Sequence, residues 1–117
     1  MRVEKADPTA RKGWSVGPWN SSLAVALGYA NAGVDEPHLH QHLTEVYLIA
    51  RGTSFLRVEQ QTVRLEAGDV AVVEPGEAHT FLSSSPAYFH FVVHVPGPTD
   101  RPFAEDKRMV ARSQLGL

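Results

Sequence analysis

The chain has 117 residues, 43% hydrophobic and 21% charged, with a formal net charge of −2 and no cysteine. Such a length suits one compact domain, and so little charge excludes nucleic acid or an anionic membrane surface as a partner attracted by bulk electrostatics. The lack of cysteine excludes disulfides and thiol nucleophiles, so any metal must be held by nitrogen and oxygen. No apolar run approaches the roughly 18 residues of a membrane-spanning helix, and the N-terminus lacks a signal-peptide core, so we expect a cytoplasmic protein.

Short strands separated by turn residues dominate the pattern. Alternating or β-branched runs predict strands at residues 21–30, 44–50, 53–59, 61–66, 69–75 and 87–95. Their regular spacing predicts an all-β fold of two antiparallel sheets, arranged as a sandwich or barrel. We expect one domain over residues 1–117, with a barrel core over about 21–97, an N-terminal arm at 1–20 and a C-terminal tail at 98–117.

The two ends of the chain carry weaker signals. In the tail, the pattern predicts a short helix from about Ala104 to Arg112 that ends near Gly116. In the arm, Trp14 and Trp19 precede the first predicted strand. These large aromatic side chains either cover a barrel mouth as a lid or pack against a partner subunit.

Histidines alternate in the segment EPHLHQHLTEVYLIARG, residues 36–52. Residues i and i+2 of a strand point to the same face, so His38 and His40 project side by side and can share one metal ion. Glu45 lies an odd number of positions after His40, so a continuous strand would point it to the opposite face. It joins the two histidines only if the chain bends between residues 41 and 44.

A third histidine follows a turn in the segment GDVAVVEPGEAHTF, residues 68–81. The Pro-Gly turn returns His79 toward the region of the first two. Three imidazoles and one carboxylate suit iron, manganese, nickel, cobalt, copper or zinc, whereas calcium and magnesium prefer oxygen ligands. The sequence therefore predicts one divalent transition metal per chain and leaves its identity open.

These two segments resemble the two motifs of the cupin superfamily. The first motif, His-x-His, four residues, Glu, six residues and Gly, is filled by His38, His40, Glu45 and Gly52. The second motif, Gly, five residues, Pro-x-Gly, two residues and His, is filled by Gly68, Gly76 and His79. Glu74 replaces its proline and Ser83 its trailing asparagine, and neither is a ligand position. The resemblance implies a small jelly-roll barrel, a double-stranded β-helix, with the metal inside one end. It assigns as ligands His38, His40, Glu45 and His79.

Five further residues are candidates for the pocket or for support of the ligands: His42, Tyr47, Phe81, His90 and His94. His42 falls in the connecting segment, where an exposed or supporting position is expected rather than ligation. Tyr47 and Phe81 are expected in an apolar pocket wall.

The last predicted strand has two different faces. His90 and His94 share one face with Val92, and the aromatic face carries Phe89 and Phe91. We expect the aromatic face to point into the barrel. The alternative, an inward histidine face, adds two titratable groups to the pocket.

A divalent ion with one carboxylate and three neutral imidazoles keeps a net charge near +1, which favours an anionic oxygen ligand. Four protein ligands leave two open positions on an octahedral ion, enough for a substrate and dioxygen. We therefore expect a metal-dependent dioxygenase acting on a small oxygenated organic molecule. The resemblance also implies a decarboxylase, an isomerase or a non-catalytic cupin module that binds a sugar or organic acid. Because cupin barrels commonly pair, a homodimer is expected.

Overall fold

The computed structural model describes residues 1–97 and 106–117. Its regular elements, in chain order, are β1 (Lys12–Val16), β2 (Ala26–Ala30), β3 (His38–His40), β4 (Thr44–Arg51), β5 (Thr53–Val58), β6 (Gln61–Glu66), β7 (Val70–Val73), β8 (His79–Ser84), β9 (Phe89–Val95), β10 (Lys107–Met109) and the 3₁₀ helix η1 (Arg112–Leu115). The described part of the chain has no α-helix, and the predicted all-β fold is confirmed. Its one helical segment is too short to cross a membrane.

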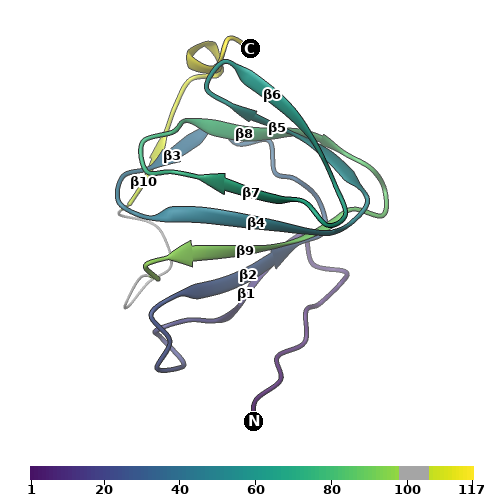
Figure 1. Cartoon of the computed structure of the whole chain (residues 1–117), viewed down its shortest axis with the longest axis vertical. Coiled ribbons are helices and arrows are strands. Elements are labelled where there is room, and N and C mark those ends of the chain that lie inside the picture. Colours follow the sequence, from purple (N-terminus) through teal and green to yellow (C-terminus); the bar gives the residue numbers. More distant parts are fainter. Residues whose placement is uncertain (98–105) are drawn as a thin grey trace.

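The strands form two five-stranded antiparallel sheets (Figure 1). The first sheet has the order β1-β2-β9-β4-β7, and the second has the order β10-β3-β8-β5-β6. From β3 to β9 the chain passes repeatedly between the sheets, so that β3 and β4, neighbours in sequence, lie in different sheets. This topology is that of the predicted jelly-roll barrel.

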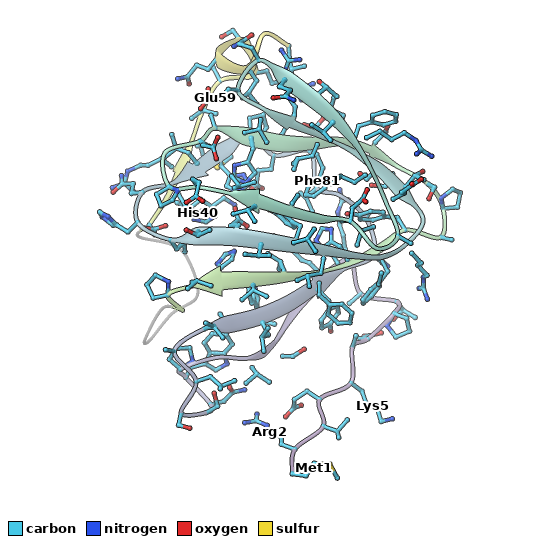
Figure 2. The ribbon with its side chains drawn as sticks, viewed as in Figure 1. Met1, Arg2, Lys5, His40, Glu59 and Phe81 are labelled. Atoms are coloured by element: carbon cyan, nitrogen blue, oxygen red, sulfur yellow. The ribbon has the colours of Figure 1, made fainter. Side chains whose placement is uncertain are left out.

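The core lies between the sheets because alternate residues of each strand face inward. In β4, Glu45, Tyr47 and Ile49 are buried, whereas Leu48 is exposed. The central cluster draws on both sheets and consists of Tyr47, Ile49, Leu56, Leu65, Val73, Phe81, Tyr88 and Val92. Full burial of a large apolar side chain contributes about 1.5–3 kcal/mol. Phe81 lies well inside the sandwich, whereas His40 lies near one end (Figure 2).

Two turns depend on glycine. Gly52, between β4 and β5, has a φ of +75°, and a Cβ there would come within 2.6 Å of the Tyr88 Cα. Gly76, between β7 and β8, has a φ of +85°, and its N–H donates a hydrogen bond of 2.7 Å to the carbonyl of His40. Glycine adopts such positive φ angles at no steric cost. The second turn thus holds the start of β8 beside β3.

Most predicted strands are confirmed, and the N-terminal part differs from expectation. The runs at 44–50, 53–59, 61–66, 69–75 and 87–95 correspond to β4, β5, β6, β7 and β9. The run at 21–30 forms a strand only from Ala26, because the preceding residues turn between β1 and β2. β1 lies within the expected arm and pairs with β2, which extends the first sheet.

The predicted tail helix is wrong in the described residues. The expected span includes Ala104 and Glu105, which lie outside the described residues. From Lys107 to Met109 the chain is instead the edge strand β10, paired with β3, and η1 follows it. Hydrogen bonds to a strand distant in sequence outweigh the local helical preference here. Gly116 ends η1 in the left-handed conformation, close to the predicted end.

Candidate metal centre

Three strands bring the four predicted ligands together at one end of the sandwich, and a fourth strand adds His94. β3 carries His38 and His40, β8 begins with His79, and these strands pair with His38 directly opposite His79. β4 of the other sheet carries Glu45, and β9 places His94 opposite it. The site therefore lies between the sheets, with ligand candidates from both.

The bend required for Glu45 is present. Residues 41–42 turn between β3 and β4 and are exposed, and the chain then enters the other sheet with Leu43 buried. Because the two sheets face each other, the side of a strand that points inward in one sheet would point outward in the other. Glu45 consequently faces the histidines despite its odd spacing from His40. His42 is exposed in this turn, as expected, and lies outside the pocket.

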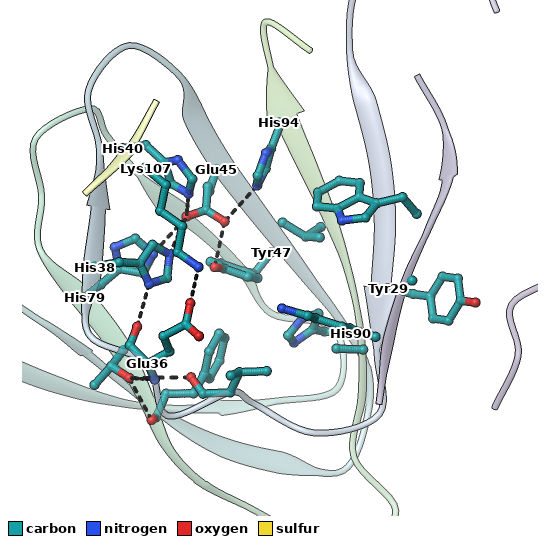
Figure 3. A pocket seen from close by; sticks show the side chains of 18 residues that line it. Tyr29, Glu36, His38, His40, Glu45, Tyr47, His79, His90, His94 and Lys107 are labelled. Atoms are coloured by element: carbon teal, nitrogen blue, oxygen red, sulfur yellow. Dashed lines mark hydrogen bonds and ion pairs between the residues drawn. The ribbon is translucent and has the colours of Figure 1, made fainter. Parts of the chain in front are cut away.

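The Glu45 carboxylate is the centre of the cluster, and its two oxygens have different neighbours (Figure 3). Oε1 faces the Nε2 atoms of three imidazoles, at 2.8 Å from His79, 3.0 Å from His40 and 3.6 Å from His38. Oε2 lies 2.9 Å from the Nε2 of His94 and accepts a hydrogen bond of 2.8 Å from the Tyr47 hydroxyl. Two three-residue sets, each including Glu45, place their ligand atoms within 4.8 Å of one another.

The other ring nitrogens of the three predicted ligand histidines also face oxygen atoms. Nδ1 of His38 lies 2.5 Å from the carbonyl oxygen of Glu36, and Nδ1 of His79 lies 3.0 Å from that of Glu77. Nδ1 of His40 lies 3.1 Å from the Asp106 carboxylate. A carbonyl or carboxylate can only accept, so each Nδ1 carries a proton.

This tautomer leaves Nε2 of each neutral ring as a lone pair aimed at the Glu45 carboxylate. Two acceptors in contact repel each other, and protonating three neighbouring imidazoles would gather three positive charges in a buried site. A cation between the Nε2 atoms and Oε1 removes the conflict. Histidines that bind metals usually donate the other N–H to a carbonyl or carboxylate, as here. The residues therefore fit a bound transition metal.

Glu45 is ionised in this environment. Burial alone raises the pKa of its carboxyl group, but the close contacts with the imidazoles of His38, His40, His79 and His94 outweigh burial and hold the pKa well below its usual value. Burial, reinforced by the nearby charge of Glu45, raises the pKa of Tyr47 well above that of a free phenol. Tyr47 therefore remains a neutral hydrogen-bond donor to the carboxylate.

The expectation that the aromatic face of β9 points inward is wrong. His90 and His94 are 4% and 3% exposed, whereas Phe91 is 47% exposed. Phe89 lies on the same outer side as Phe91, where it is buried against Tyr29 with ring centroids 5.9 Å apart. The inward histidines find hydrogen-bond partners that phenyl rings could not use, which are Glu45 for His94 and the Tyr88 hydroxyl for His90.

Next to the cluster, a pocket has an aromatic wall. Tyr47 and Phe81 line it as expected, with ring centroids 5.0 Å apart. His90 lines the same wall, stacked on Phe81 at 5.2 Å, and its Nδ1 lies 2.7 Å from the Tyr88 hydroxyl. Burial lowers the pKa of His90 to about 4, partly opposed by the charge of Glu45. His90 is therefore neutral near pH 7.

Several pocket residues were absent from the sequence-based candidates. Trp14 of β1 lines the pocket, with its ring 4.8 Å from that of His94, so it is part of the barrel wall. Glu36 and Lys107 form an ion pair beside the pocket. Asp106 contacts His40 across 66 positions of sequence, a separation at which no local pattern could have indicated the contact.

The two facing sheets and the inward metal-ligand cluster define a double-stranded β-helix with a candidate metal site at one end. The sequence matches the family model described as "Cupin domain" over residues 28–95. The chain belongs to the cupin family. No curated protein matches it in sequence.

Solved structures share this fold. A variant of Pac13 from Streptomyces, solved with uridine, is 13% identical with a TM-score of 0.67, over 93% of this chain and 84% of that one. Pac13 is described as a nucleoside dehydratase. KdgF from Halomonas sp. is 16% identical with a TM-score of 0.63, over 74% and 80%. The DMSP lyase DddQ from Ruegeria pomeroyi is 19% identical with a TM-score of 0.56, over 74% and 43%. At these identities the similarity concerns the fold.

Proposed function

We propose that this protein is a metal-dependent enzyme that acts on a small, anionic, oxygenated organic molecule, and that its reaction is an elimination of the lyase class. One observation carries the metal dependence. Three imidazoles are fixed with Nδ1 on an oxygen acceptor and Nε2 directed at the same Glu45 oxygen. A divalent transition metal held there would act as a Lewis acid on a substrate oxygen.

The proposed ligands are the Nε2 atoms of His38, His40 and His79 and the Oε1 atom of Glu45. Tyr47 and His94 both contact the other oxygen of the carboxylate, at 2.8 Å and 2.9 Å. They hold Glu45 so that Oε1 remains directed at the three imidazoles. Glu45 is ionised, so it also supplies the one negative charge among the ligands.

The pocket favours a small substrate. Its volume of about 130 Å³ is below the roughly 300–1,000 Å³ that drug-sized ligands occupy. Its inner wall is aromatic, from Tyr47 and Phe81, and would exclude water from that side of a bound molecule. Two lysines, Lys12 and Lys107, and two carboxylates, Glu36 and Glu45, line the pocket. A divalent metal on Glu45 would leave the site with a net positive charge, which favours an anion.

His90 gives this wall one hydrogen-bonding group. Burial raises the pKa of Tyr88, so its hydroxyl keeps its proton. Within the described residues, Nδ1 of His90 is the partner of that hydroxyl, and a donated bond from Tyr88 leaves the proton of the neutral imidazole on Nε2. We propose that this N–H binds a substrate oxygen remote from the metal ligands.

Two considerations favour elimination. A Lewis acid at a carboxylate or carbonyl oxygen stabilises the negative charge that develops when the neighbouring carbon loses a proton. Among proteins of similar fold, one is described as a dehydratase and another as a lyase, and dehydratases also work by elimination. Oxygenation by dioxygen is the second candidate. The aromatic wall favours it, as would the positions left open on a six-coordinate metal held by four protein ligands.

The test begins with protein purified without a metal-affinity tag, beside a His40→Ala variant. We expect about one transition metal per wild-type chain by elemental analysis and none in the variant. The loaded protein is then incubated with small carboxylates that bear a hydroxyl or other leaving group on the β-carbon, and with uridine. Ultraviolet absorbance follows the new double bond, and an oxygen electrode follows dioxygen.

Each result has a distinct meaning. A new double bond without dioxygen uptake supports the lyase, and dioxygen consumption that depends on substrate supports the dioxygenase instead. Tight anion binding without turnover supports a non-catalytic module. No metal in the wild type, even after reloading with iron, manganese, nickel and zinc, would overturn the proposal.

We further propose a homodimer, as the sequence predicts. The outer face of the first sheet exposes apolar side chains from three adjacent strands: Leu48, Val70, Val72, Phe91 and Val95. Contiguous apolar patches on a surface commonly mark protein contacts. A twofold dimer would place this apolar patch against its own copy. The cytoplasmic location also stays a prediction.

A further inference from the structure

We infer that the C-terminal strand completes the metal centre, with Asp106 as the residue that positions His40. This inference rests on the proposed metal site. Asp106 lies outside residues 28–95, the part of the chain that matches the cupin family. Its Oδ2 atom lies 3.1 Å from Nδ1 of His40, and its side chain is 19% exposed.

Asp106 makes three contacts with consecutive residues of the bend. Besides Oδ2 on His40, Oδ1 accepts a hydrogen bond of 2.8 Å from the backbone N–H of His42. Its carbonyl accepts one of 3.0 Å from the N–H of Gln41. One residue therefore fixes both the imidazole of His40 and the backbone that turns from β3 toward Glu45.

The strand that carries Asp106 is itself held in place. β10 pairs with β3 so that Lys107 lies opposite His40 and Met109 lies opposite His38. Beyond β10, Arg112 forms an ion pair of 2.7 Å with Asp35, and Leu115 is fully buried. These contacts give the Asp106 carboxylate a defined position beside the ligand.

Asp106 differs from the partners of the other two ligand histidines. His38 and His79 each have a backbone carbonyl at Nδ1, from residues two positions earlier in their own segments. His40 has instead a charged side chain from the far end of the chain. A carboxylate fixes the tautomer of an imidazole and makes its other nitrogen a stronger ligand, and loss of such a partner typically weakens metal binding by roughly 10–100-fold.

The experiment measures the affinity for Co²⁺ alone, by competition with a chromophoric chelator, so that no substrate is needed. The variants are Asp106→Asn, which keeps an oxygen to accept the His42 N–H, and Asp35→Asn. The second is a matched control, because it removes a carboxylate that ties down the same C-terminal segment without contacting a ligand. We expect about a 10–100-fold loss of affinity for Asp106→Asn and less than about 3-fold for Asp35→Asn.

A double-mutant cycle with His40→Ala, measured at Co²⁺ concentrations high enough to occupy the weakened site of that variant, separates positioning from general stability. If Asp106 acts through His40, Asp106→Asn has no further effect on Co²⁺ affinity when His40 is absent. Circular dichroism checks that each variant is folded. Equal affinities of the folded wild type and Asp106→Asn, or losses that add in the double variant, would overturn the inference. Failure of the wild type to bind any metal would instead overturn the proposed function.

Discussion

The two faces of the first sheet carry opposite chemistry on the same strands. On β9 the inward residues include His90 and His94, both buried and hydrogen-bonded, whereas Phe91 and Val95 are exposed on the outside. On β4 the same contrast separates buried Glu45 from exposed Leu48. At these positions the polar groups are inside and the apolar groups outside, the reverse of what burial of apolar surface alone would favour.

The interior of the barrel is divided between apolar packing and a polar cluster. Buried polar groups are tolerated when each has a partner, and here the partners are one another. The central cluster from Tyr47 to Val92 supplies apolar packing for stability, while one end of the sandwich is reserved for imidazoles around one carboxylate. The apolar residues on the outer face form the surface that the proposed dimer would use.

The largest effect is expected at the inner polar cluster. Glu45→Gln preserves the shape of the side chain but removes the one negative charge among the proposed ligands. We expect metal affinity to fall by more than the roughly 100-fold that outer partners of a ligand contribute. Elemental analysis detects this loss as a lower metal content of the purified variant. Glu66→Gln, at an exposed glutamate paired with Arg64, is the control and should bind metal like the wild type.

The second test compares neighbours on opposite faces of β4. Ile49 is 4% exposed within the core cluster, and Leu48 is 38% exposed on the outer face. Ile49→Ala should lower the free energy of unfolding by about 2–5 kcal/mol, because it leaves a cavity. Leu48→Ala should change it by less than about 1 kcal/mol. Denaturant unfolding measures both, and similar losses would contradict the assigned faces.

The third test uses the pH dependence of stability. Burial lowers the pKa of His90 to about 4, so between pH 6.5 and 4 the unfolded chain binds a proton that the folded protein does not. Stability is therefore complete above pH 6.5 and falls with pH through this window, by about 3 kcal/mol from this group.

The comparison is made between metal-free wild type and His90→Asn, whose side chain can still accept the bond from Tyr88. Both proteins share the contributions of Glu45 and His94, which cancel in the difference. We expect the difference in unfolding free energy between pH 7 and pH 4 to be smaller in the variant. Parallel pH profiles would mean that His90 titrates normally and is not enclosed.

The smallest effect on stability is expected at the outer face. Val72→Lys places a charge on an exposed position of β7, so the monomer should lose less than about 0.5 kcal/mol. A dimer that uses this face would nevertheless dissociate, because the charge would be buried without a partner. Light scattering after size-exclusion chromatography gives the mass. A wild type that is monomeric at all concentrations would contradict the dimer.

Much of the fold was predictable from local pattern. Alternation and turn glycines predicted five strands near their observed positions, because side chains on a strand repeat every two residues. β10 was not predictable in this way, since a three-residue strand exists only through its pairing with β3. The same limit applies to Asp106, which reaches His40 only after that pairing forms.

The sequence by itself determined the types and spacing of the proposed ligands and the need for a bend before Glu45. It determined that His90 and His94 share a face, because parity is a local property of the strand. It did not determine which face points inward. Parity is unchanged when a strand is turned over. The orientation is decided by the folded chain, in which the inner side of β9 places His94 opposite Glu45 of the paired strand β4 and His90 beside the Tyr88 hydroxyl.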